Sequence, residues 1–167
     1  VFRNTARGTI LAKSPRHTGK KTEHQKEQGK KFLKAVAYAK QALADSSLSP
    51  HYKQLAAASL NKLSAYNIAV ADYLRPPVIE HIDTTAYKGA ATGEKILITV
   101  TDNVKVTAVK VRIENNDESE VEQGNATLHE GKWLYVTTAT NASITGDKVI
   151  VTATDRPGNN TTKEVVL

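Results

Sequence analysis

Residues 95–114, KILITVTDNVKVTAVKVRIE, decide the fold of this chain. In their second half Val109, Val111 and Ile113 alternate with charged residues, so that one face of an extended segment is apolar and the other charged. Asp102-Asn103 separates this run from an earlier apolar run and is typical of a turn. The pattern predicts antiparallel strands that belong to a sheet covered on one side.

Similar runs recur through the rest of the chain after residue 77, and turn-forming Gly, Asn, Asp and Pro residues separate them. Seven or eight short strands in about 90 residues, without an intervening helical period, favour a β-sandwich over residues 78–167. The predicted strands are 78–83, 95–101, 106–114, 119–123, 125–129, 132–139, 147–154 and 161–167.

Two motifs in this region resemble bacterial immunoglobulin-like domains. Residues 146–159, GDKVIVTATDRPGN, are similar to the penultimate strand and turn of those domains, where the pattern V-x-V-x-A-x-D-x-x-G-N recurs. Residues 98–103, ITVTDN, resemble the early strand and turn that pack against it. The resemblance implies an immunoglobulin-like sandwich over 78–167. The chain differs from antibody-type domains in two respects: it has no cysteine for an inter-sheet disulfide, and its Trp133 is expected in a later strand of the sandwich. Both differences match the disulfide-free bacterial branch of the family.

The preceding residues, 22–75, have the composition of helices. Thr22 and Gln25 have the spacing of a capping box, which predicts a helix from about residue 23 to about residue 45. Phe32, Val36, Ala39 and Leu43 recur at steps of 4, 3 and 4 and are expected to form its buried face.

A second helix is expected to begin at Ser49-Pro50, with Ser49 as the N-cap, and to run to residue 75. Its apolar and small residues follow a 3.5-residue period, which predicts a helix association seam. A break near Asn61 or Ser64 would instead divide this helix in two and weaken the seam. Pro76-Pro77 is the expected domain boundary, because the pair cannot continue a helix. The seam residues are Tyr52, Ala56, Ser59, Leu63, Tyr66, Val70 and Tyr73.

Charge is distributed unevenly along the chain. Residues 1–40 carry 11 Lys or Arg and two Glu, a net charge of +9, whereas the other 127 residues have a net charge of −3. Residues 1–21 are expected to form a basic extended arm, in which Thr9–Ala12 could pair as a lone edge strand with a partner. Such an arm can contact an anion, a nucleic acid or an acidic partner. The candidate contact residues are Arg7, Lys13, Arg16, Lys20, Lys21, Lys26, Lys30 and Lys34.

The sequence offers little chemistry for catalysis. It lacks cysteine, and its five histidines are not spaced as zinc ligands. Nucleophile-elbow, P-loop and dinucleotide-binding motifs are absent. We therefore expect no enzyme activity, no metal, no cofactor and no small-molecule substrate.

Two groups of acidic residues could still hold calcium. Asp102 and Asp155 each end a strand and are expected to cap turns, with a shared calcium site as the alternative. The cluster of Glu114, Asp117, Glu118, Glu120 and Glu122 is expected to be a solvated sheet edge, with calcium binding again the alternative.

The expected architecture is a multidomain α+β chain with a basic arm (1–21), a helical hairpin (22–75), a Pro-Pro boundary (76–77) and an immunoglobulin-like sandwich (78–167). It suggests a structural subunit that self-associates or docks through its arm and helices in a homo-oligomer or a surface, filament or virion-like assembly. The alternatives are sequence-independent nucleic-acid binding by the arm and an adhesin-like binding module. No apolar run reaches the ~20 residues of a membrane-spanning helix, and the first residue, Val1, leaves room for a natural start upstream.

Overall fold

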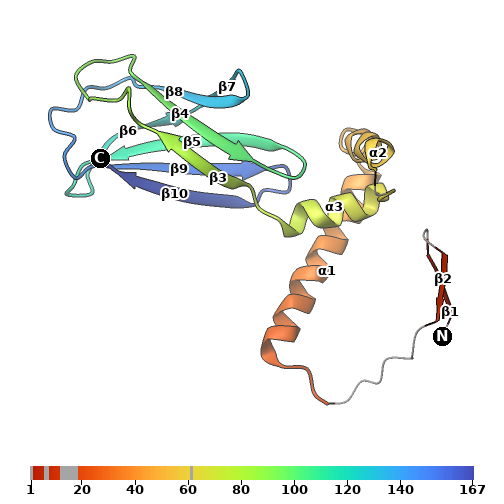
Figure 1. Cartoon of the computed structure of the whole chain (residues 1–167). Helices are drawn as coiled ribbons and strands as arrows, with labels where there is room; N and C mark the ends of the chain where they lie inside the picture. The colour runs from red at the N-terminus through yellow and green to blue at the C-terminus, as the bar shows by residue number, and fades with distance from the viewer. Residues whose placement is uncertain (1, 6–7, 12–18, 61) are drawn as a thin grey trace. The chain divides into compact units, whose positions relative to one another are not determined.

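The computed structural model describes residues 2–5, 8–11, 19–60 and 62–167 (Figure 1). The chain is a mixed α+β protein with two compact units, Val1–Lys31 and Phe32–Leu167. One helix, α1 (Glu23–Ala44), crosses the boundary between the units.

The first unit differs from the expected extended arm. Strands β1 (Phe2–Thr5) and β2 (Gly8–Leu11) pair antiparallel, with Phe2 opposite Leu11. The expected edge strand is therefore paired within its own chain rather than with a partner. The capping box at the start of α1 is confirmed: the Thr22 amide donates to Gln25 Oε1 at 3.1 Å, and the Gln25 amide donates to Thr22 Oγ1 at 3.2 Å.

The buried face of α1 is narrower than the predicted one. Ala35, Ala39 and Ala42 are fully buried, whereas Phe32, placed on that face by its spacing, is 52% exposed. These alanines belong to one buried helical core with Tyr52, Ala69 and Val70 of the other two helices. The prediction for Phe32 is therefore wrong, because alanines rather than the large residues form the contact ridge.

The single second helix predicted from residue 49 to residue 75 is also wrong. The structure has two helices there, α2 (Ser49–Ala58) and α3 (Ala65–Leu74), which is the alternative with a break near Ser64. Ser64 caps α3, because its hydroxyl accepts the Asn67 amide at 3.2 Å. Since the backbone turns between the two helices, the predicted seam residues cannot form one continuous stripe.

The start of α2 lacks the predicted cap. Ser49 is already the first residue of the helix, and its hydroxyl makes no hydrogen bond. Asp45 stabilises this turn instead, since its Oδ1 accepts the amides of Ser47 at 2.7 Å and Leu48 at 3.1 Å. An Asx turn between α1 and α2 thus replaces a side-chain cap on α2.

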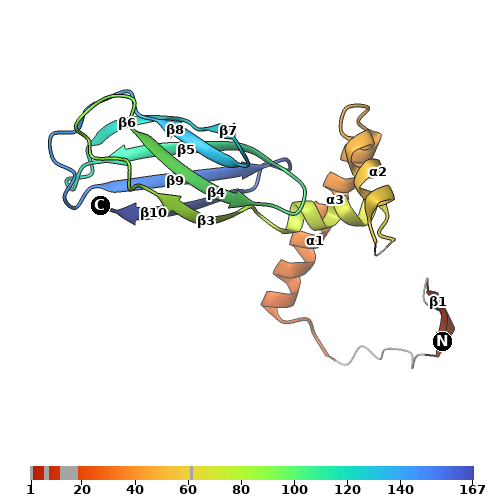
Figure 2. The same cartoon turned by 45° about the horizontal axis from the view of Figure 1, so that its top comes forward.

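The eight strands predicted after residue 77 are all present in two antiparallel sheets of four strands each (Figure 2); the first three have the predicted bounds, and the other five have shifted ends. Their orders are β10-β9-β5-β6 and β3-β4-β8-β7. The strands are β3 (Val78–Asp83), β4 (Lys95–Thr101), β5 (Val106–Glu114), β6 (Glu120–Asn125), β7 (Thr127–His129), β8 (Lys132–Val136), β9 (Lys148–Asp155) and β10 (Asn160–Val166).

Both sheets contribute to one apolar core. Ile98 of β4 and Tyr135 of β8 belong to the same buried cluster as Val111 of β5 and Val151 of β9. The strict alternation in β9, whose residues are buried at every second position, explains how one strand face fills this core.

The helices join the sheets through a tight connection. α3 ends at Leu74, β3 begins at Val78, and Pro77 between them is buried. The Thr161 hydroxyl donates to the Pro77 carbonyl oxygen at 2.6 Å, and Asn159 Nδ2 donates to the Tyr73 carbonyl oxygen at 3.2 Å. The β9–β10 end of one sheet is therefore hydrogen-bonded to the exit of the helices.

Candidate functional site at the junction of helices and sheets

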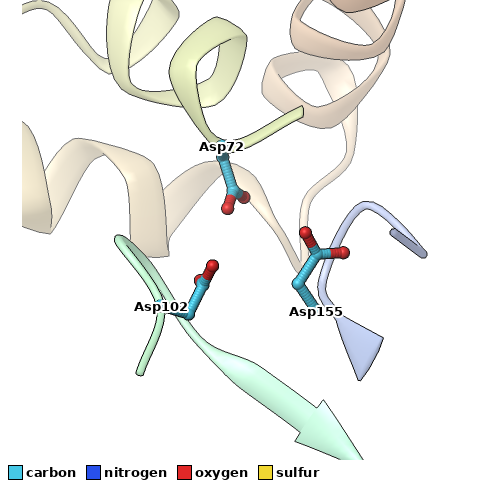
Figure 3. Close-up of side chains that lie close together, drawn as sticks. All are labelled: Asp72, Asp102 and Asp155. Carbon is cyan, nitrogen blue, oxygen red and sulfur yellow. The ribbon is translucent and has the colours of Figure 1, made fainter. Parts of the chain in front are cut away.

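Three aspartates meet where the helices join the sheets (Figure 3). Asp72 lies in α3, Asp102 follows β4, and Asp155 ends β9. One carboxylate oxygen from each residue lies within 4.8 Å of those of the other two. Figure 3 shows the three carboxyl groups directed toward a common space.

Two of these aspartates close turns, as the sequence predicts. Asp102 Oδ2 accepts the amides of Val104 at 2.9 Å and Lys105 at 2.7 Å. Asp155 Oδ1 accepts the Asn159 amide at 2.6 Å, and its Oδ2 accepts Asn159 Nδ2 at 2.7 Å. These bonds fix the direction of both carboxylates at one end of the sheets.

Asp72 is held by a chain of two tyrosines. The Tyr52 hydroxyl of α2 donates to Asp72 Oδ2 at 2.5 Å, and the hydroxyl oxygens of Tyr38 and Tyr52 are 2.7 Å apart. Each hydroxyl has one proton, so Tyr38 must donate to Tyr52 when Tyr52 donates to Asp72. One residue from each helix thus positions the Asp72 carboxylate.

The cluster contains polar atoms that lack hydrogen bonds. Asp72 has no exposed surface, yet its Oδ1 has no hydrogen-bond partner. Asp102 Oδ1 and Arg156 Nη1 are likewise buried as atoms and have no hydrogen-bond partner. A buried polar atom without a partner costs about 1–3 kcal/mol, and more when it is charged, so this arrangement is energetically unfavourable unless another group satisfies it.

The electrostatics of the cluster reflect burial and mutual repulsion. Burial, followed by the charges of Asp102 and Asp155, raises the pKa of Asp72 to about 6, while the Tyr52 hydrogen bond opposes this. Burial also raises the pKa of Asp155, against the donors of Asn159. Arg156, whose guanidinium carbon lies 5.8 Å from the centroid of the Tyr52 ring, supplies positive charge nearby. The site therefore favours a positively charged occupant.

Sequence reasoning identified Asp102 and Asp155 but missed Asp72. The available signal was that Asp72 is the single charged residue in AYNIAVADYL, the sequence of α3. A charged residue in an otherwise apolar and small-residue helix must have a partner when that helix is buried.

The predicted association seam is dispersed over three elements. Tyr52 is buried in α2, Ser59 follows the end of α2, and Leu63 lies exposed in the loop after it. Ala56 remains in α2, whereas Tyr66, Val70 and Tyr73 lie in α3.

The predicted basic contact residues are brought together only in part. Lys26, Lys30 and Lys34 are exposed on α1, and Lys26 pairs with Glu23 at 2.7 Å. Lys20 and Lys21 precede the helix and are exposed. Arg7, Lys13 and Arg16 lie outside the described residues.

The acidic cluster at β5 and β6 does not converge into a cation site among the described residues, where Asp72, Asp102 and Asp155 form the one such group. Arg112 pairs with Glu114 and with Glu120, while Asp117 accepts the Ser119 amide. Glu122 points inward, and its Oε2 accepts the Tyr135 hydroxyl at 3.1 Å. Glu118 is exposed. These interactions divide the cluster between ion pairs, a turn and the interior.

No protein-family model and no curated protein sequence matches this chain. It is similar to a solved structure described as an engineered protein, with 19% sequence identity and a TM-score of 0.38. The similarity covers 61% of this chain and 26% of that one, so the chain spans about a quarter of that protein's length. Within the described residues, no helix is long and apolar enough to cross a lipid bilayer.

Proposed function

We propose that the protein is a non-enzymatic structural subunit that self-associates through its helical segment. The observation that carries the proposal is a pair of exposed apolar residues in the middle of α1. Phe32 is 52% exposed and Leu33 67% exposed, although the buried face of the same helix starts shortly after them, at Ala35. Large apolar side chains in water at the middle of a helix favour a protein partner.

The distribution of exposed apolar residues supports this location. Among the described residues, eight of the twelve large exposed apolar side chains precede residue 76, although the body of two sheets contains most of the core. The helical segment contributes Leu55, Leu60 and Leu63 in addition to Phe32 and Leu33. The exposed apolar surface is therefore concentrated in the N-terminal half.

Charge favours a second copy of the same chain as the partner. The first 40 residues have a net charge of +9, and the remainder has a net charge of −3. Lys30 and Lys34 are exposed on α1, while Asp117 and Glu118 are exposed beside the edge strand β6. Complementary charges on one molecule promote head-to-tail association between copies.

We also propose that the body of two sheets is an immunoglobulin-like sandwich that the assembly displays. In such a sandwich strands A, B, E and D form one sheet and strands C, F and G the other. Assigning A to β3, B to β4, C to β5, D to β7, E to β8, F to β9 and G to β10 gives the observed neighbours, with β6 added beside β5.

Light scattering after size-exclusion chromatography tests self-association. We expect oligomers at low salt that dissociate toward monomers at high salt, because exposed charge pairs are screened. Phe32→Ser/Leu33→Ser should shift the chain toward monomers without changing its charge. The matched control Ala37→Ser/Ala44→Ser, at exposed positions of the same helix, should leave the oligomer unchanged. A strict monomer at high concentration in low salt would contradict the proposal.

Nucleic-acid binding is the second candidate. Lys30 and Lys34 are one helical turn apart, and among the described residues neither makes an ion pair, which suits contact with a phosphate backbone. A mobility shift with unrelated DNA and RNA tests it. Binding that weakens with salt and with Lys30→Gln/Lys34→Gln supports this function, and the absence of a shift at low salt contradicts it.

A further inference from the structure

We propose that Asp72, Asp102 and Asp155 bind one calcium ion that fastens α3 to the turns at one end of the two sheets. This site is independent of the proposed self-association. The donors are carboxylate oxygens, which hard divalent cations prefer. They come from a helix and from two turns that lie far apart in the sequence (Figure 3).

The spacing of the donors suits calcium. Calcium–oxygen distances are about 2.3–2.6 Å, so two ligands on opposite sides of one ion are about 5 Å apart at most. The three carboxylate oxygens lie within 4.8 Å of one another, a separation that one ion can span. Magnesium holds its ligands at about 2.0–2.1 Å in a strict octahedron, which this spread of donors fits less well.

An independent observation points to a ligand. Asp72 has no exposed surface, and its Oδ1 has no hydrogen-bond partner although the Tyr52 hydroxyl occupies its Oδ2. Asp102 shows the same division, with two amides on Oδ2 and no hydrogen bond to Oδ1. Asp72 and Asp102 are therefore each oriented by one oxygen and leave the other available to a cation, whereas both oxygens of Asp155 accept hydrogen bonds from Asn159, so a cation would share one of them.

The charges of the site also favour a cation. Three carboxylates face one another, and among the described residues none of them forms an ion pair. Arg156 is the neighbouring cation, but its guanidinium lies over the Tyr52 ring and its Nη1 has no hydrogen-bond partner. One calcium ion together with Arg156 balances three carboxylates.

The proposal is tested on the full chain after treatment with EGTA. Isothermal titration with calcium chloride is expected to show one site per chain, and calcium is expected to raise the Tm, because a ligand that binds only the folded state stabilises it. Magnesium chloride at the same concentration should produce a smaller shift. An equal shift with magnesium would overturn the assignment to calcium. No heat and no Tm shift at about 5 mM calcium, beyond the affinity range of protein calcium sites, would overturn the site itself.

A pair of matched variants locates the ion. Asp102→Asn removes one ligand charge and keeps an oxygen that can accept the amides of Val104 and Lys105, so the turn is preserved. We expect it to weaken calcium binding on the order of tenfold or more. Asp83→Asn changes another turn aspartate, one that accepts the Thr85 amide at 3.0 Å and lies outside both acidic groups, and this variant should bind calcium like the unmodified chain. Equal binding by both variants would overturn the proposal, and the calcium titration of the unmodified chain decides the matter if Asp102→Asn does not fold.

Discussion

Gly89 shows how a single residue fixes a loop of the sheet region. Its φ is +71°, and a Cβ atom there would lie 2.5 Å from the Asn141 carbonyl oxygen and 2.8 Å from Ile144 Cγ2. Gly93 has a similar φ of +88°, but a Cβ atom would meet nothing within 4 Å. A side chain at Gly93 would meet backbone strain alone, whereas a side chain at Gly89 would meet backbone strain and a steric clash.

We expect Gly93→Ala to lower the free energy of unfolding by about 1–2 kcal/mol, the cost of a left-handed conformation. Gly89→Ala should cost about 1–3 kcal/mol more, because the loop that carries Asn141 must move. Urea denaturation of both variants measures the difference. If the two variants had equal urea midpoints and slopes, the loop that carries Asn141 would move without lowering the free energy of unfolding, which contradicts the prediction.

Asp45 couples the turn between α1 and α2 to pH. The Ser47 hydroxyl, followed by the Ser47 and Leu48 amides, holds the pKa of Asp45 below its usual value. A lowered pKa in the folded state contributes stability that is present above the unfolded pKa, about 3.9, and is lost as the pH falls through the folded value.

Asp45→Ala should therefore destabilise the chain at neutral pH and lose less additional stability on acidification than the unmodified chain. Urea denaturation between about pH 5 and about pH 2 measures this. Asp117→Ala is the comparison at a second place in the chain, because the pKa of Asp117 is also lowered but its turn connects two strands of a sheet rather than two helices. Parallel pH profiles for the Asp45 variant and the unmodified chain would contradict the prediction.

At the scale of elements, α1 depends on small residues where it meets α2 and α3. Ala39 is fully buried in the helical core, whereas Ala37, two residues earlier, is exposed. Ala39→Leu should lower the free energy of unfolding by about 1–3 kcal/mol, because the larger side chain forces the helices apart. Ala37→Leu introduces the same residue into the same helix and should be nearly neutral. Circular dichroism during thermal unfolding compares them, and an equal loss would mean that the helices repack freely.

The elements differ in how well the sequence predicts them, and the reason is physical. Strands such as β5 and β9 are predicted because alternation and turn residues are local properties. The division between α2 and α3 is not, because a 3.5-residue period continues through residues 59–64 while Ser64 caps a new helix. The period describes only the spacing of side chains along the sequence, and it does not show where the backbone leaves one helix and begins another.

The proposed calcium site was likewise only partly predictable from local sequence patterns. Asp102 and Asp155 could be paired from the sequence, because each follows a strand and such ends can meet. Asp72 could not, since its position depends on how α3 packs on α2 and on the Tyr52 hydroxyl. The convergence of three residues separated by 30 and 53 positions is a tertiary property.

The compact unit Phe32–Leu167 contains both the helical core and the sheets, which predicts that they unfold together. Val104, from the turn after β4, packs into the helical core, and Asn159 and Thr161 donate to the backbone at Tyr73 and Pro77. Separating the helices would expose this contact and leave buried carboxylates without their partners. The contact therefore makes a partly unfolded state costly.

Two probes on one urea series check this. Fluorescence of Trp133, the single tryptophan, reports on the sheets, and ellipticity at a helical wavelength reports on α1, α2 and α3. We expect coincident transitions in EGTA, and a joint shift to higher urea with calcium if the ion joins α3 to the sheets. A helical transition that precedes the tryptophan transition would mean that the junction is weaker than its hydrogen bonds indicate. A calcium shift confined to one probe would place the ion within one part rather than across the junction.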